Sequence, residues 1–153
     1  MLTKIRSAFS SNKSRSFHLF QIEPSLLCNI RCVMCPWIEH RAASGGHMSW
    51  ETFSKIAENL HLAQEVDLTG GGEPLCNQQI SDMVKTVKVA GCRVGFSTNG
   101  SLLTKSLAEE LTRLGLDWIS FSVDAANANT YEAIRRGASF EKVITNIDAL
   151  NQI

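Results

Sequence analysis

Three cysteines lie within eight residues, in the stretch CNIRCVMC. The spacing of Cys28, Cys32 and Cys35 lets one loop bring three sulfurs to a metal centre. Three thiolates leave one position open, which on zinc could be filled by water or by a histidine such as His40 or His47. On a cubic iron–sulfur cluster, the open iron could bind a substrate or cofactor. The third alternative is a set of buried cysteines without a metal.

The chain contains five cysteines in all. Cys76 lies three residues after Glu73, and as a fourth thiolate it would close the site and make the domain an electron carrier; a small buried side chain is the alternative. Cys92 begins a predicted strand at its amino end and is interpreted as structural. Because no secretory signal precedes these residues, we expect a cytoplasmic location and a metal or thiol role rather than a disulfide framework.

Polar motifs follow the predicted strands at their carboxyl ends. In TGGGEP, Gly71 and Gly72 would allow a ligand to approach the backbone closely. Glu73, followed by Pro74, supplies a carboxylate that could hold an ammonium group. Glycine runs also form simple turns, so the motif gains its meaning from its place after a strand.

Two more motifs occupy equivalent positions after later strands. STNG contains Thr98 and Asn99, and SVD contains Ser122 and Asp124. Asn-Gly is also a common tight-turn pair. Since parallel α/β folds place ligands at the carboxyl ends of their strands, we expect these side chains to meet the cysteine loop at one edge of a sheet.

Composition bounds the class of protein. The chain has 153 residues, 44% of them hydrophobic and 20% charged, which is typical of one globular domain. Fifteen basic residues balance fifteen acidic ones, so charge favours no nucleic acid partner. No run is long and apolar enough to span a membrane. Residues 1–16 carry only basic charges and are expected to form a disordered basic leader.

Short apolar runs alternate with helical patterns, which predicts repeated strand–helix units and a parallel sheet. Strands are expected at 18–23, 64–70, 92–98 and 118–124. The first expected helix begins after Ser49, whose side chain can cap it, and the second covers residues 78–90. The third contains a capping box at Ser106 and ends near Gly115. A fourth helix is expected over residues 128–136, and a fifth starts at Ser139.

The strands alternate apolar and polar side chains instead of being apolar throughout. Val66 and Leu68 oppose Asp67 and Thr69, for example. Doubly wound sheets are covered on both faces and would need nearly continuous apolar strands. We therefore predict the α/β class and a partial parallel (βα) barrel of about four βα units, whose polar faces line a lumen with a ligand at its mouth.

Taken together, CNIRCVMC, GGEP, STNG and FSVDAANANTYEAIRRG resemble the radical S-adenosylmethionine (radical SAM) enzyme family, over nearly everything from residue 18 onward. These motifs are most similar to those of the branch with peptide and protein maturases and molybdenum-cofactor synthesis enzymes. The resemblance implies one 4Fe-4S cluster held by Cys28, Cys32 and Cys35, with S-adenosylmethionine on the open iron. It also implies reductive cleavage to a 5′-deoxyadenosyl radical, hydrogen abstraction from an unidentified substrate, and an electron donor such as flavodoxin or ferredoxin.

The resemblance also implies roles for residues of the other motifs. Gly71, Gly72 and Glu73 would contact the methionyl amino group, with Pro74 in the same motif. The remaining candidates for cofactor contact are Thr98 and Ser122 near the ribose or carboxylate, Asn99 and Asp124 on the same rim, Arg135 or Arg136 on the carboxylate, and Met34, which replaces an aromatic near the adenine. Trp37 could stack there or belong to the core.

The family core has about six strand–helix units, of which this sequence supplies about four. Residues 17–153 are therefore expected to form a core domain that is incomplete at its C-terminus, and a partner chain could complete the barrel. Two other functions stay open: an electron-transfer module with Cys76 as fourth ligand, and a zinc-stabilised interaction domain.

Overall fold

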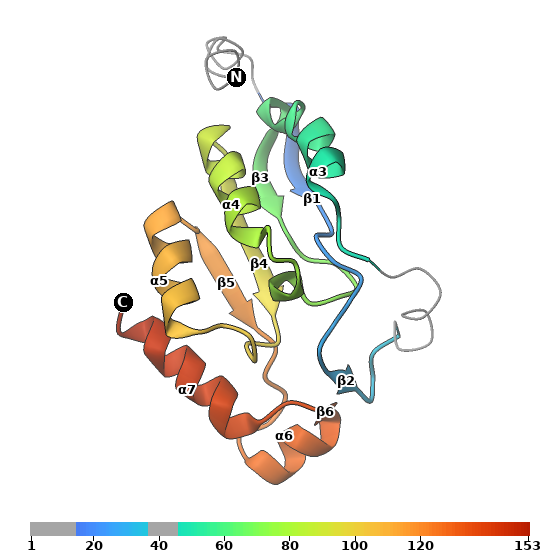
Figure 1. The fold of residues 1–153 in the computed structure, drawn as a ribbon, viewed down its shortest axis with the longest axis vertical. Helices are drawn as coiled ribbons and strands as arrows, with labels where there is room; N and C mark the ends of the chain where they lie inside the picture. The colour runs from blue at the N-terminus through green and yellow to red at the C-terminus, as the bar shows by residue number, and fades with distance from the viewer. Residues whose placement is uncertain (1–14, 37–45) are drawn as a thin grey trace.

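The computed structural model describes residues 15–36 and 46–153 (Figure 1). Most of the predicted basic leader lies outside these residues. The elements run along the chain as β1 (Phe17–Gln21), β2 (Arg31–Cys32), α3 (Trp50–Ala57), η1 (Leu60–Leu62), β3 (Ala63–Asp67), η2 (Pro74–Cys76), α4 (Ile80–Val89), β4 (Arg93–Thr98), α5 (Lys105–Leu114), β5 (Trp118–Phe121), α6 (Ala128–Ile134), β6 (Arg135–Arg136) and α7 (Phe140–Asn151).

Four parallel strands form one sheet in the order β1-β3-β4-β5. Val66 of β3 pairs with Phe20 of β1 and Val94 of β4, and Phe96 of β4 pairs with Ile119 of β5. Helical segments connect consecutive strands (Figure 1). The predicted α/β class with a partial parallel barrel of βα units is confirmed, and each strand ends within three residues of its predicted end.

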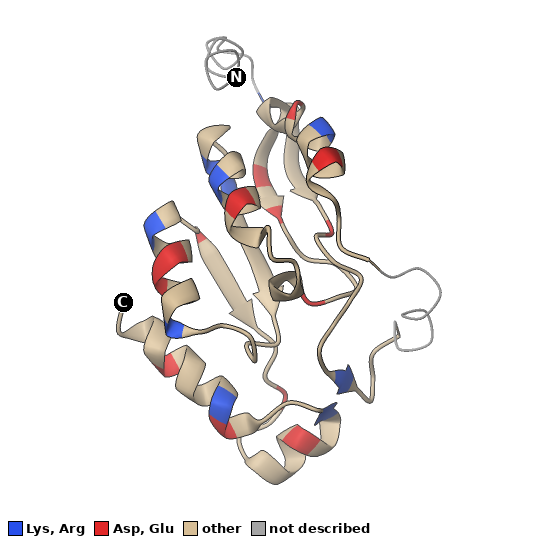
Figure 2. Ribbon diagram, viewed as in Figure 1, with Lys and Arg blue, Asp and Glu red and all other residues tan. Residues whose placement is uncertain are grey.

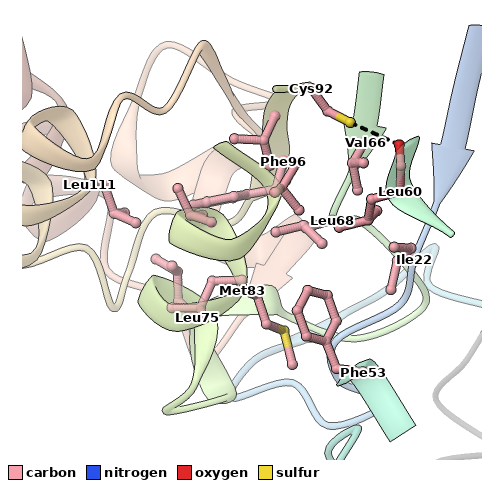
Figure 3. Close-up of a cluster of buried hydrophobic side chains, with 14 of the residues drawn as sticks. Ile22, Phe53, Leu60, Val66, Leu68, Leu75, Met83, Cys92, Phe96 and Leu111 are labelled. Atoms are coloured by element: carbon pink, nitrogen blue, oxygen red, sulfur yellow. Dashed lines mark hydrogen bonds between the residues drawn. The ribbon is translucent and has the colours of Figure 1, made fainter. Parts of the chain in front are cut away.

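One face of the sheet packs against α3, α4 and α5 and holds the core. Val66, Val94 and Phe96 alternate onto this face and are fully buried. Each such side chain contributes about 1.5–3 kcal/mol by leaving water. Figure 3 shows Val66 and Phe96 with neighbours from the covering helices and adjoining loops, namely Ile22, Phe53, Leu68, Leu75, Met83 and Leu111. The core also includes Val84, Val87 and Ala108.

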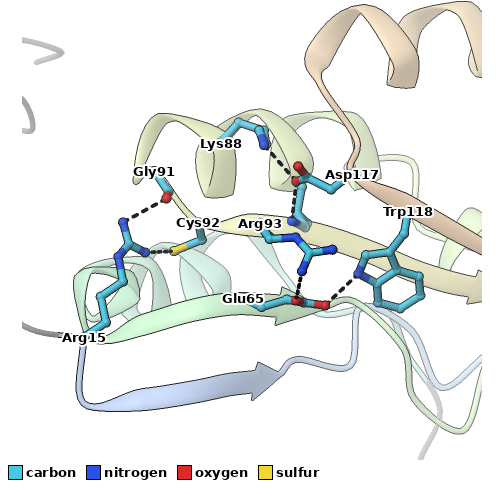
Figure 4. Close-up of polar contacts among 9 residues, drawn as sticks. Arg15, Glu65, Lys88, Gly91, Cys92, Arg93, Asp117 and Trp118 are labelled. Atoms are coloured by element: carbon cyan, nitrogen blue, oxygen red, sulfur yellow. Dashed lines mark hydrogen bonds and ion pairs between the residues drawn. The ribbon is translucent and has the colours of Figure 1, made fainter.

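The opposite face is more polar and is closed at the amino ends of the strands by Trp118. Its indole lies over Gly95 of β4, and its Nε1 donates to Glu65 Oε1 at 2.8 Å (Figure 4). Arg93 Nη1 pairs with the other oxygen of Glu65 at 3.1 Å. The indole thus covers the part of this face that lies away from the motif-bearing loops.

The start of β4 is tied to its neighbours by polar contacts. Cys92 is buried, and its Sγ contacts the carbonyl oxygens of Leu60 and Ala63 at 3.2 and 3.3 Å. Arg15 donates to Cys92 Sγ at 2.9 Å and to the Gly91 carbonyl at 2.8 Å (Figure 4). These contacts agree with the structural interpretation of Cys92.

Local caps explain most helix boundaries. Ser49 caps α3 as predicted, and Ser139, the predicted start of the last helix, caps α7. The capping box predicted at Ser106 is wrong, because Thr104 already caps α5: its Oγ1 accepts from the Leu107 amide at 3.2 Å. The described part of the chain contains no helix that could cross a bilayer.

The helix predicted over residues 128–136 is shorter than expected. α6 ends at Ile134, and Arg135 and Arg136 form β6, which pairs antiparallel with Cys32 and Arg31 of β2. The amide of Val33 also donates to the Ile134 carbonyl at 2.9 Å. The helix stops here because the next residues hydrogen-bond to the cysteine loop, a partner far away in the sequence.

Gly95→Ala tests the packing of Trp118. A Cβ at this position would lie 2.2 Å from Trp118 Cδ2 and 2.4 Å from the Trp118 carbonyl oxygen. We expect a loss of about 1–3 kcal/mol or more in the free energy of unfolding, measured by urea titration, because the backbone oxygen cannot move aside freely. Gly46→Ala is the control, since nothing lies within 4 Å of its added methyl group. Equal stability of the two variants would contradict this packing.

Asp117→Asn tests an ion pair by its pH dependence. Burial alone would raise the pKa of Asp117, but hydrogen bonds from Lys88 and the Val94 amide bring it below its ordinary value of 3.8. A lowered carboxyl pKa stabilises the fold above pH 4 and loses this contribution as pH falls through that range. We expect Asp117→Asn to lower the free energy of unfolding by about 1 kcal/mol at pH 7 and by progressively less below pH 4. Urea titrations at pH 7 and at several values below pH 4 measure this difference.

The control for Asp117→Asn is Glu51→Gln. Glu51 pairs with Lys55 at the same distance, 2.8 Å, but both side chains are more than 70% exposed. Such exposed ion pairs contribute little to the free energy of unfolding. If Asp117→Asn changed the free energy of unfolding by the same amount at every pH, and by no more than Glu51→Gln, the lowered pKa of Asp117 would be contradicted.

Candidate active site

The loops that follow the parallel strands meet at the carboxyl edge of the sheet. The segment after β1 leads to Cys28, the loop after β3 carries Glu73, and the loop after β4 carries Asn99. The amide of Glu73 donates to the Leu27 carbonyl at 2.7 Å, and Asn99 Nδ2 lies 3.7 Å from Cys28 Sγ. The structure therefore brings together the three motifs that the sequence predicted to meet.

Glu73 is a buried carboxylate at the centre of this arrangement, with 3% of its surface exposed. Thr98 Oγ1 and the Leu75 amide donate to Oε1 at 2.6 and 3.1 Å, and the Asn99 amide donates to Oε2 at 2.8 Å. These bonds occupy three of the about four acceptor positions of a carboxylate. Glu73 thus uses most of its acceptor positions within the protein, and it fixes the loops after β3 and β4 to each other.

Burial raises the pKa of Glu73 above its ordinary value, while the hydrogen bonds from Asn99, Thr98 and Leu75 act in the opposite direction. The cost of burying the charge is reduced only as long as all three donors stay in place. The carboxylate therefore makes the positions of the two loops interdependent.

The glycine motif packs closely against the segment after β1. A Cβ at Gly72 would lie 2.3 Å from the Ser25 carbonyl oxygen and 2.5 Å from that of Leu27. The Gly71 amide donates to Glu23 Oε1. Only glycine allows this approach, and it leaves the Gly71–Gly72 backbone next to the loop that bears Cys28.

A side-chain network joins the cysteine loop to the loop after β4. Asn99 Nδ2 donates to Asn29 Oδ1 at 3.0 Å, and Asn99 Oδ1 accepts from Ser101 Oγ at 2.6 Å. Asn29 Nδ2 donates to Ser101 Oγ at 2.7 Å, which closes the triangle. Sequence reasoning missed Asn29 and Ser101; each neighbours a predicted residue, but their contact spans 72 positions.

Arg135 and Asp124, predicted as separate cofactor contacts, bind each other. Arg135 Nε donates to Asp124 Oδ2 at 2.5 Å, and its Nη1 donates to Cys32 Sγ at 3.5 Å. The Arg135 side chain is only 13% exposed. The guanidinium therefore lies between the end of β5 and the second cysteine, where its charge acts on the sulfur.

The three cysteines are close enough to influence one another. Cys32 is buried, while Cys28 and Cys35 are partly exposed. Burial raises the pKa of the Cys32 thiol, the charge of Arg135 lowers it, and the charges of Cys28 and Cys35 raise it further. Such mutual repulsion is what a bound cation would relieve.

This donor set fits a cluster better than a single ion. Within residues 15–36 and 46–153, no three His, Cys, Asp or Glu side chains converge on a position for one metal ion. A cubic cluster offers a separate iron to each thiolate, so the sulfurs need not converge. His47, one of the candidate zinc ligands, contacts Ser25 Oγ through Nδ1 at 3.0 Å. His40 and Trp37 lie outside the described residues.

The other predicted residues lie at the edges of this site. The Ser122 amide donates to the Thr98 carbonyl at 2.9 Å, which places Ser122 beside the loop after β4. Pro74 begins η2 and is buried, and the Cys76 amide donates to the Glu73 carbonyl at 3.0 Å. Met34 is 52% exposed on the cysteine loop, where it is open to a ligand.

Comparisons with known proteins place the chain among enzymes of one superfamily. The chain is 36% identical over 129 residues to the tungsten-containing aldehyde ferredoxin oxidoreductase cofactor-modifying protein of Pyrococcus furiosus, covering 80% of this chain and 36% of that protein. It is 30% identical over 127 residues to the AdoMet-dependent heme synthase of Methanosarcina barkeri, covering 82% of this chain and 36% of the relative. The chain thus spans little more than a third of the length of these relatives.

Solved structures share the fold. Native anSMEcpe with bound AdoMet matches with a TM-score of 0.74 and 19% identity, over 89% of this chain and 41% of that one. Methylornithine synthase (PylB) matches with a TM-score of 0.69 and 20% identity, over 97% of this chain and 45% of that one. The Radical SAM superfamily matches residues 22–153, which is most of the chain. The chain therefore belongs to the radical SAM superfamily.

Proposed function

We propose that Cys28, Cys32 and Cys35 hold a 4Fe-4S cluster and that S-adenosylmethionine binds beside it, against the loops after β3 and β4. The observation that carries this proposal is the continuous chain of contacts from Cys28 through Asn99 to Glu73. It connects the cysteine loop to the two loops that would receive the cofactor. When bound, the reduced cluster supplies the electron that cleaves S-adenosylmethionine to methionine and a 5′-deoxyadenosyl radical for hydrogen abstraction.

The protein's own contribution is to position and shield these parts. In this proposal the carbonyl oxygens of Gly71 and Gly72 and the fourth acceptor position of Glu73 accept from the methionyl amino group. Thr98, Asn99, Ser122 and Met34 surround the same edge of the sheet. In this proposal Arg135 keeps its contacts with Asp124 and Cys32. The carboxylate of S-adenosylmethionine therefore needs a different hydrogen-bond donor.

The substrate is proposed to be a peptide, a protein or a cofactor precursor. The names of two relatives, a cofactor-modifying protein and a heme synthase, support the cofactor precursor. The electron donor is proposed to be an acidic protein such as flavodoxin or ferredoxin in the cytoplasm. Arg31 and Arg136 support this, because they form an exposed basic pair on β2 and β6 beside the cysteines (Figure 2).

Cysteine variants test the cluster and the role of Cys76. We expect anaerobic reconstitution to give about four irons per chain in the wild type, and less than about one in Cys28→Ala, Cys32→Ala or Cys35→Ala. Cys76→Ala should keep the full iron and sulfide content, measured by chemical analysis and absorbance. Loss of the cluster in Cys76→Ala would support the closed electron-transfer site, and zinc in place of iron would support the zinc-stabilised domain.

Glu73→Gln tests the cofactor site. The amide nitrogen of glutamine would face either the Asn99 amide or the Thr98 hydroxyl, so one buried donor loses its acceptor. We expect S-adenosylmethionine to bind the cluster-loaded protein at least about tenfold more weakly, measured by calorimetry. Glu51→Gln, on the exposed face of α3, is the control. Unchanged affinity in Glu73→Gln would remove Glu73 from the site.

A further inference from the structure

The only tyrosine of the chain, Tyr131, is completely buried and has no hydrogen-bond partner for its hydroxyl. It lies on α6, at the end of the molecule where α6, β6 and β2 come together (Figure 1). Its ring packs against Phe140 with the centroids 5.4 Å apart. The ring is thus held by apolar contacts, while its polar atom is left over within the described structure.

Leaving a buried hydroxyl without a partner costs about 1–3 kcal/mol. A phenylalanine would avoid that cost and keep the ring contact. Because Tyr131 has no exposed surface, a partner from outside could not reach the hydroxyl without opening the packing. The missing acceptor must therefore arise among the groups that already surround it.

The Arg135 amide donates to the Tyr131 carbonyl, and Arg135 pairs with Cys32 between β6 and β2, so Tyr131 and Cys32 are both neighbours of Arg135. Four charged or ionisable groups act on the Tyr131 hydroxyl, namely Arg135, Cys32, Asp124 and Glu132. Burial raises the pKa of Tyr131, Arg135 lowers it, and Cys32 and Asp124 raise it. Arg135 has no acceptor to offer. Asp124 Oδ2 already accepts from Arg135 at 2.5 Å, and Glu132 Oε1 accepts from the Phe140 amide at 3.0 Å. Cys32 remains, as a weak acceptor while its sulfur carries a proton.

We propose that Tyr131 is a positioning residue that donates its hydroxyl hydrogen to Cys32 Sγ when that sulfur ligates iron. The inference rests on the proposed function, since a thiolate ligand is what turns Cys32 into a strong acceptor. Arg135 Nη1 already donates to the same sulfur at 3.5 Å. Tyr131 and Arg135 together then place two donors on one ligand.

Two donors on a ligating sulfur stabilise the additional negative charge of the reduced cluster. Hydrogen bonds to the sulfurs are among the factors that set the reduction potential of such clusters. Tyr131 is therefore expected to make the cluster easier to reduce. The effect reaches the cluster through Cys32 and requires no contact with substrate or S-adenosylmethionine.

The test is the midpoint potential of the reconstituted protein, followed by electron paramagnetic resonance during a redox titration. We expect Tyr131→Phe to shift the midpoint to a more negative value. Because the chain has one tyrosine, growth on 3-fluorotyrosine alters this residue alone, and its more acidic hydroxyl should shift the midpoint to a more positive value. Phe140→Leu is the control: it loosens the same ring and keeps the hydroxyl, so the potential should stay the same.

Resonance Raman spectra give a second readout that packing alone would not move. The iron–sulfur stretch of the Cys32 ligand should shift in deuterium oxide in the wild type, and this shift should shrink in Tyr131→Phe. Cluster-loaded proteins with equal potentials and equal isotope shifts overturn the role of Tyr131 and leave the proposed function intact. A wild type that takes up no iron overturns both.

Discussion

The hydrogen bonds of the buried Glu73 carboxylate are the interaction on which the rest of the site depends. They hold Thr98 and Asn99 against the glycine motif, and the Asn99 side chain then reaches Asn29 and Cys28. Three loops that are distant in sequence become one rigid edge in this way. A cofactor arriving there meets a surface that is already organised, which lowers the entropy cost of binding.

The two faces of the sheet explain why the site lies where it does. One face is packed with apolar side chains against α3, α4 and α5. The other carries polar side chains and is covered by Trp118 at the amino ends of the strands. The motif-bearing loops lie at the carboxyl edge, and there the cysteine loop adds thiols; β6 pairs with this loop, and Arg135 acts on the Cys32 sulfur.

Features encoded by neighbouring residues could be predicted from the sequence, including the four strands, the cap at Ser49 and the helix start at Ser139. The convergence of the motifs could also be predicted, because parallel strands place their carboxyl ends at one edge of the sheet. The individual side-chain and backbone contacts between distant segments could not be predicted. β6 exists because Arg135 pairs with Cys32 across 103 positions, and Asp124 is occupied by the same arginine. The cap at Thr104 was missed for a local reason, since two suitable residues, Thr104 and Ser106, compete for one helix start.

The central claim is that three cysteines leave one iron open to S-adenosylmethionine. The most direct measurement is electron paramagnetic resonance of the anaerobically reconstituted, dithionite-reduced protein, with and without S-adenosylmethionine. We expect a reduced-cluster signal whose shape changes when S-adenosylmethionine is added. A signal that stays the same, or a protein without iron, would contradict it.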